Sequence, residues 1–139
     1  MEILEKNLTR GGEFIIKETH CNDVFTPEDF TEEQKMMKDA VRDFAEKEIW
    51  GRKSEFEKHN YDLTFEVIKK AGELGFLGVG VPEDYGGLGM PFTSSMLVCD
   101  YISGSSGSTS TAFGAHTGIG TFPILLYGNE EQKKKYVPK

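Results

Sequence analysis

The sequence predicts an all-α fold, an up-and-down bundle of about six helices. Three observations support this class. Apolar residues recur at helical spacing in several segments, capping residues precede these segments, and glycines or prolines separate them. The only strand-like signal is the apolar run 76–81. At 139 residues, with ten phenylalanines, the chain is long enough to form one compact domain.

The first helix is expected to run from the capping box at Thr31 to about Ile49. In this motif the side chains of Thr31 and Gln34 each satisfy a free backbone N–H at the helix start. Apolar residues then follow at 3.6-residue spacing. Residues 1–30 show no sustained period and are interpreted as an N-terminal arm that packs on the domain through the apolar residues 14–16, so the domain itself is predicted to span 31–139.

A second helix is expected to begin at a cap formed by Asp62 or Thr64 and to end before Gly75. Glycine suits that position because the residue after a helix often has a positive φ. The polar stretch 51–60 is interpreted as a loop with room for one short helix. Residues 76–81 are predicted to form a buried extended connector, and the three glycines within 86–89 predict a turn.

Three or four further helices complete the prediction. Pro91 suits the first turn of a helix that carries Met96, and residues 103–111 are expected to form a bend. Residues 109–120 predict a helix weakened by its glycines, and Pro123 starts another that stops at residue 128. The sequence Asn-Glu-Glu-Gln at 129–132 then predicts the cap of the last helix.

The composition excludes several classes of function. A net charge of −7 argues against a nucleic-acid surface, and no apolar run approaches the roughly 20 residues of a membrane span. Without a secretory signal, the two cysteines are expected to be free buried thiols, and the protein to be cytoplasmic. Histidines and cysteines lack metal-ligand spacing, so no metal is expected, and His116 is interpreted as a core or rim histidine.

No catalytic residues can be assigned from the sequence. It contains no recognisable Ser/His/Asp triad and no pair of carboxylates with a clear acid–base role. The glycines of 86–89 suggest a phosphate loop at first sight. However, they lack the Lys-Ser/Thr of such a loop, so a turn is the better explanation. Cofactor-binding residues are unknown at this stage.

Four small residues lie on one face of the helix predicted at 109–120. Thr111, Gly114, Ala115 and Gly118 follow the spacing i, i+3, i+4, i+7. A glycine inside a helix costs about 1 kcal/mol relative to alanine, so two of them need an explanation. Close packing of a neighbouring helix is one explanation, and it is favoured by spacing alone. A furrow that admits a thin apolar ligand is the other.

Three segments resemble the N-terminal helical domain of the acyl-CoA dehydrogenase family. They are LGFLGVGVPEDYGGLG at 74–89, GAHTGIG at 114–120 and YGNEEQKKKYVPK at 127–139. The resemblance extends from Thr31 to the end of the chain, and the GAH segment is similar to members that act on long and very long acyl chains. Because the chain stops at Lys139, between elements, we expect it to be one lobe of a larger protein.

The resemblance implies a three-domain flavoenzyme. Such an enzyme removes the α-proton of an acyl-CoA with a glutamate and passes the β-hydride to FAD, as in fatty acid β-oxidation. Acyl-CoA and electron-transfer flavoprotein are the implied partners, in a homo-oligomer. The middle β-domain and the C-terminal helical domain, which hold the base and most flavin contacts, are absent from these 139 residues. The chain is therefore expected to be inactive by itself and not to hold FAD.

The resemblance also implies that this domain walls off part of the acyl pocket, which makes the furrow the favoured interpretation of the small residues. Two alternatives stay open: an acyl-CoA oxidase of the same superfamily, and a standalone helical interaction module without catalysis. In an isolated chain the faces that pack on missing domains would be exposed, so association is expected. The pocket residues implied by the resemblance are Met96, Thr111, Gly114, Ala115, Gly118 and Ile119.

Overall fold

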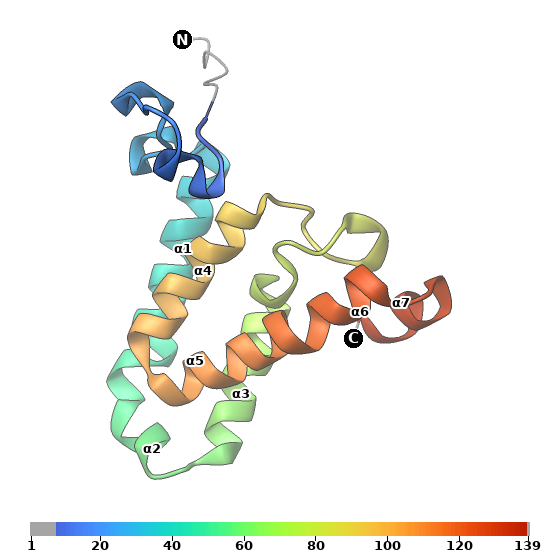
Figure 1. Ribbon diagram of the computed structural model, residues 1–139. Helices are drawn as coiled ribbons and strands as arrows, with labels where there is room; N and C mark the ends of the chain where they lie inside the picture. The colour runs from blue at the N-terminus through green and yellow to red at the C-terminus, as the bar shows by residue number, and fades with distance from the viewer. Residues whose placement is uncertain (1–7, 139) are drawn as a thin grey trace. The chain divides into compact units, whose positions relative to one another are not determined.

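The structure is a computed structural model that describes residues 8–138, and every regular element in this range is a helix (Figure 1). The all-α prediction is therefore confirmed. The described residues form two compact units, one up to Lys35 and one from Met36 onward. Within this range, no helix is both long and apolar enough to cross a membrane.

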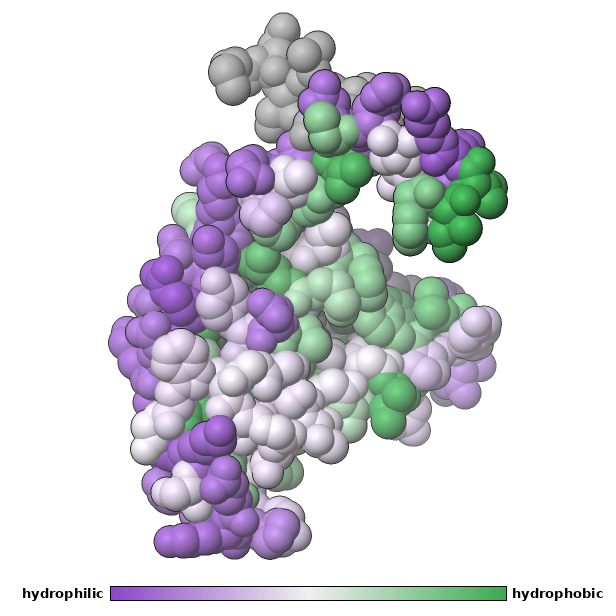
Figure 2. All heavy atoms as spheres, turned by 60° about the vertical axis from the view of Figure 1, so that its left-hand side comes forward, coloured by the Kyte–Doolittle hydropathy of each residue, from purple (hydrophilic) through white to green (hydrophobic). Residues whose placement is uncertain are grey.

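The first unit consists of short 3-10 helices: η1 (Gly11–Ile15), η2 (Cys21–Asp23) and η3 (Pro27–Asp29). None of these helices contains a buried residue, and Cys21 is an exposed free thiol rather than a buried one. Figure 2 shows hydrophobic side chains at the surface of this part of the chain, beside hydrophilic ones. The predicted capping box is confirmed, because the N–H of Gln34 donates to Oγ1 of Thr31 at 3.2 Å and the Thr31 N–H donates back to Gln34 Oε1 at 3.0 Å.

The remaining helices build the core. Helix α1 (Glu32–Glu48) matches the prediction, and the polar stretch after it contains η4 (Trp50–Arg52) and α2 (Lys53–Glu57). Next come α3 (Tyr61–Glu73) and α4 (Phe92–Ser105). The buried core residues come from these helices, from the connector between α3 and α4, and from the helix that follows α4: Val41, Phe44, Ile49, Phe56, Leu63, Val67, Ala71, Phe76, Val79, Val98, Ile102 and Phe113.

The cap of α3 differs from the prediction. The helix begins after Asn60, whose Oδ1 accepts the N–H of Leu63 at 3.1 Å. Asn60 is as good a cap as the predicted Asp62 or Thr64, and starting there adds the buried Leu63 to the apolar face of the helix. The end of α3 is as predicted, since Gly75 has a φ of +80°.

The extended connector predicted at 76–81 is wrong. Residues Phe76–Gly78 form the 3-10 helix η5, in which the N–H of Gly78 donates to the carbonyl oxygen of Gly75 at 3.1 Å. The tight turn puts residues three apart on the same side, so Phe76 and Val79 both enter the core, with 3% and 2% of their surface exposed. After η6 (Glu83–Tyr85), the predicted glycine turn is confirmed by positive φ values at 86 and 89.

The fourth and fifth predicted helices form one continuous rod, visible in orange in Figure 1. It comprises α5 (Gly107–Gly114), the π-helix η7 (Ala115–Thr121) and α6 (Phe122–Tyr127). Pro123 has no N–H to donate, and the wider π turns before it carry the chain onward without a break. The last helix, α7 (Glu130–Tyr136), has the predicted capping box, with Gln132 N–H to Asn129 Oδ1 at 2.9 Å.

Candidate functional site

The structure divides the six predicted pocket residues into an outward group and a cavity group. Thr111 and Ala115 are exposed on the rod, and Ile119 is 81% exposed. Gly114 and Gly118 are partly buried and line a cavity together with Met96 of α4. The small residues therefore contribute both to an open face of the rod and to the wall of a cavity beside it.

The space beside the two cavity glycines is open. A Cβ atom added at Gly114 or Gly118 would meet nothing within 4 Å, other than the backbone of its own helix. At Gly120, by contrast, a Cβ would lie 3.0 Å from the carbonyl oxygen of Ala115. Close packing of a neighbouring helix therefore does not explain Gly114 and Gly118, although it was the explanation favoured by spacing alone.

The cavity next to these glycines lies between α4, the rod and the connector after α3, and its volume is about 250 Å³. Its walls are mostly apolar. One polar atom, Oγ of Ser95, is buried there without a hydrogen-bond partner among the described residues. Gly80 allows α4 to approach, because a Cβ at that position would lie 2.8 Å from the same Oγ. The other lining side chains include Phe76, Val79, Val81, Phe92, Cys99, Phe113, Thr117 and Phe122.

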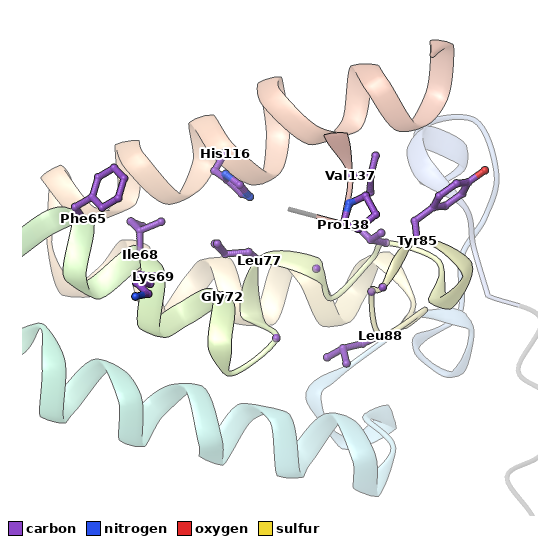
Figure 3. Close-up of a pocket in the computed structure, with 15 residues that line it drawn as sticks. Phe65, Ile68, Lys69, Gly72, Leu77, Tyr85, Leu88, His116, Val137 and Pro138 are labelled. Atoms are coloured by element: carbon purple, nitrogen blue, oxygen red, sulfur yellow. The ribbon is translucent and has the colours of Figure 1, made fainter. Parts of the chain in front are cut away.

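A second cavity, of about 540 Å³, lies on the other side of the connector (Figure 3). It is bounded by α3, the loop 75–88, the rod and the end of the chain at Val137 and Pro138. His116 is exposed and lines this cavity, which makes it a rim histidine. Sequence reasoning missed this cavity because four segments, far apart in the chain, each supply part of the wall.

Two polar clusters connect helices near these cavities. The hydroxyl of Tyr85 donates to Oε2 of Glu130 at 2.8 Å, which lowers the pKa of that carboxyl and raises the pKa of the tyrosine. Lys70 lies 2.8 Å from Glu48 and 3.0 Å from Glu66, and these carboxylates raise the pKa of the lysine. Both clusters join separate elements, so we interpret them as structural contacts.

The glycine-rich turn does not form a phosphate site. The N–H groups of residues 86–89 donate to carbonyl oxygens of Glu83, Pro82, Gly78 and Val81, so none of them is free. A Cβ at Gly87 would collide with Val81, which explains that glycine by close approach of the backbone. The described residues therefore do not form a site for the diphosphate of a flavin by themselves. Within residues 8–138, no group of three His, Cys, Asp or Glu side chains is placed to bind a metal.

Comparisons with known proteins extend this picture. A probable acyl-CoA dehydrogenase of Bacillus subtilis (strain 168) is 44% identical over 132 residues, which are 95% of this chain and 22% of that protein. The crystal structure of an acyl-CoA dehydrogenase complexed with FAD, from Bacillus anthracis, is 46% identical with a TM-score of 0.85, and it covers 92% of this chain and 22% of its own. Isovaleryl-CoA dehydrogenase from Solanum tuberosum is 35% identical over 111 residues, or 79% of this chain and 27% of that protein.

The chain thus spans about a fifth to a quarter of the length of these relatives. Six further relatives match over 108 to 111 residues, and the chain covers 26% to 28% of each. The sequence model of the family described as "Acyl-CoA dehydrogenase, N-terminal domain" matches residues 31–139. The chain therefore belongs to the acyl-CoA dehydrogenase family, of which residues 31–139 form an N-terminal domain.

Proposed function

We propose that this chain is the N-terminal part of an FAD-dependent acyl-CoA dehydrogenase, in which the rod α5–η7 forms one wall of the acyl pocket. When bound by the whole protein, FAD accepts the β-hydride of the acyl group. The 139 residues contribute binding surface to this reaction. The observation that carries the proposal is the open space beside Gly114 and Gly118, where the fold gives no reason for glycine.

The shape of the rod supports an acyl chain as the ligand. Thr111 and Ala115 lie one turn apart and expose only small side chains, so an extended hydrocarbon can approach the helix backbone closely. The Thr111 hydroxyl is turned toward its own helix, where it donates to the carbonyl oxygen of Gly107 at 3.0 Å. The face offered to a ligand is therefore less polar than its composition suggests.

Long acyl chains are the substrate class that we propose. Small side chains along the rod leave length for a chain, and the 250 Å³ cavity lies beside the same glycines. Burial of each methylene contributes about 0.8 kcal/mol, or about fourfold in affinity. A side chain that fills the furrow should therefore act more strongly on long substrates than on short ones.

The test uses a chimera in which this chain replaces the matching 132 residues of the Bacillus subtilis relative. We expect the Ala115→Glu chimera to lose more than about tenfold in kcat/KM for palmitoyl-CoA, because two or more methylenes leave the pocket. With butyryl-CoA, kcat/KM should stay within about twofold. The charge-matched control is Ser54→Glu, at an exposed position of α2.

Two results would contradict the proposal. Equal losses for both substrates would mean that Ala115 supports the fold or the reaction rather than the length of the acyl chain. A chimera that binds flavin but oxidises no acyl-CoA of any length would refute the activity itself.

Electron-transfer flavoprotein is the electron acceptor that we propose, on the strength of family membership. The whole protein that carries this chain should reduce an electron-transfer flavoprotein when an acyl-CoA is added without oxygen. Rapid consumption of oxygen with the same substrate, and no reduction of the flavoprotein, would make it an acyl-CoA oxidase instead.

A further inference from the structure

The N-terminal unit exposes three consecutive apolar side chains that neither the fold nor the proposed pocket uses. Phe14 is 65% exposed, Ile15 is 75% exposed and Ile16 is 82% exposed. Side chains of this size are among the most often buried in proteins. An exposed apolar group of this kind is typical of an interaction surface.

The arm holds these three residues in a defined conformation. The N–H of Thr9 donates to the carbonyl oxygen of Asp23 at 2.8 Å, which closes the segment between them into a loop. Glu13 and Lys17 flank the apolar residues and pair with each other at 2.8 Å, so their charges compensate. Helices η1, η2 and η3 contain no buried residue, so the arm has no core that could take up the three side chains.

The comparisons show which relatives possess this arm. The Bacillus subtilis relative matches over 132 residues, which are 22% of it, and its length is therefore about 600 residues. The Bacillus anthracis structure covers 92% of this chain, and its length, calculated in the same way, is about 580 residues. Seven relatives match over only 108 to 111 residues, about the length of the family region 31–139, and their lengths are about 390 to 420 residues.

The arm therefore accompanies about 200 additional residues in these relatives. We propose that Phe14, Ile15 and Ile16 dock on that additional segment, which is absent from the 139 residues of this chain. The proposal rests on the proposed function only in placing the chain within a longer acyl-CoA dehydrogenase. A docking partner within the region that all the relatives share would not explain why the shorter relatives match without the arm.

The experiment places a photo-reactive benzoylphenylalanine at Ile15 in the chimera defined above. After irradiation and proteolysis, mass spectrometry identifies the cross-linked peptides. The additional segment is defined by alignment of the Bacillus subtilis relative with the Solanum tuberosum one. We expect the cross-links from position 15 to fall in that segment. The matched control places the same probe at Glu18, which is exposed on the same arm, and its cross-links there should be several-fold fewer.

Any other distribution of cross-links overturns the proposal. Cross-links into the region that the shorter relatives share, cross-links between isotopically distinct copies, or yields no higher than at Glu18 would each do so. If the chimera does not fold, the same probe at the aligned residue of the Bacillus subtilis relative gives the same decision. Visible flavin absorbance and activity are recorded separately, so a failure of the proposed function is distinguishable from a failure of docking.

Discussion

Replacing Gly114 with alanine should stabilise this chain. The residue has helical dihedral angles, with a φ of −66° and a ψ of −35°, which alanine adopts without strain. An added Cβ would meet no atom within 4 Å outside its own helix. The methyl group would point into open space at the edge of the cavity, so neither collision nor loss of a contact opposes the change.

The magnitude follows from the helix propensity. Alanine is favoured over glycine inside a helix by about 0.8 to 1.0 kcal/mol, and measured Gly→Ala gains at compatible sites are about 0.4 to 1 kcal/mol. For a chain of 139 residues, an unfolding entropy of about 2.1 cal/mol/K per residue converts 0.8 kcal/mol into a rise in Tm of about 2 to 3 °C. Thermal unfolding followed by circular dichroism resolves a shift of this size.

Gly120 supplies the matched control, since it lies on the same rod. A Cβ at this position would lie 3.0 Å from the Ala115 carbonyl oxygen, so Gly120→Ala should give no gain in Tm or a loss. If Gly114→Ala instead lowers the Tm, or behaves like Gly120→Ala, then the fold does require the glycine and the argument for an open furrow fails.

Three further predictions concern the local contacts of the fold. Asn60→Ala removes the cap of α3 and should lower the free energy of unfolding by about 1 kcal/mol in urea titrations, whereas Asn60→Asp should retain most of it. Gly87→Ala forces a methyl group onto Val81 and should cost at least about 2 kcal/mol, which circular dichroism would reveal as a large drop in Tm. The Tyr85 hydroxyl lowers the pKa of Glu130, so this contact stabilises the fold above the ordinary carboxyl pKa and is lost as the pH falls through the lowered one. Tyr85→Phe should move the carbon-13 NMR titration midpoint of Glu130 upward, and an unchanged midpoint would contradict the assignment.

The sequence predicts helices well where a local signal defines them. The capping boxes at Thr31 and Asn129 are confirmed to the residue, because the groups that form them lie within one turn of each other. The connector after α3 was predicted to be extended, because an apolar run with glycines has no period that separates a strand from a tight turn. Its actual conformation depends on Phe76 and Val79 sharing one core, which is a tertiary contact.

The candidate site was predictable only in part, for a similar reason. Spacing alone placed Gly114 and Gly118 on one face, yet it favoured helix packing, because packing and open space leave the same pattern of small residues. The 540 Å³ cavity around His116 had no local signal, since its wall joins α3, a loop, the rod and the end of the chain.

The glycines of this chain separate into those that the fold requires and those that it does not. Gly75 and Gly86 have positive φ, and Gly87 touches Val81, so each is explained by local geometry. Gly114 and Gly118 have neither property, and they cost helix stability in the rod. A cost without a structural return is what a binding surface predicts, because the benefit arises only when the ligand is present. The measurement that joins the two arguments is Gly114→Ala in the chimera, which should raise Tm and lower kcat/KM for palmitoyl-CoA together.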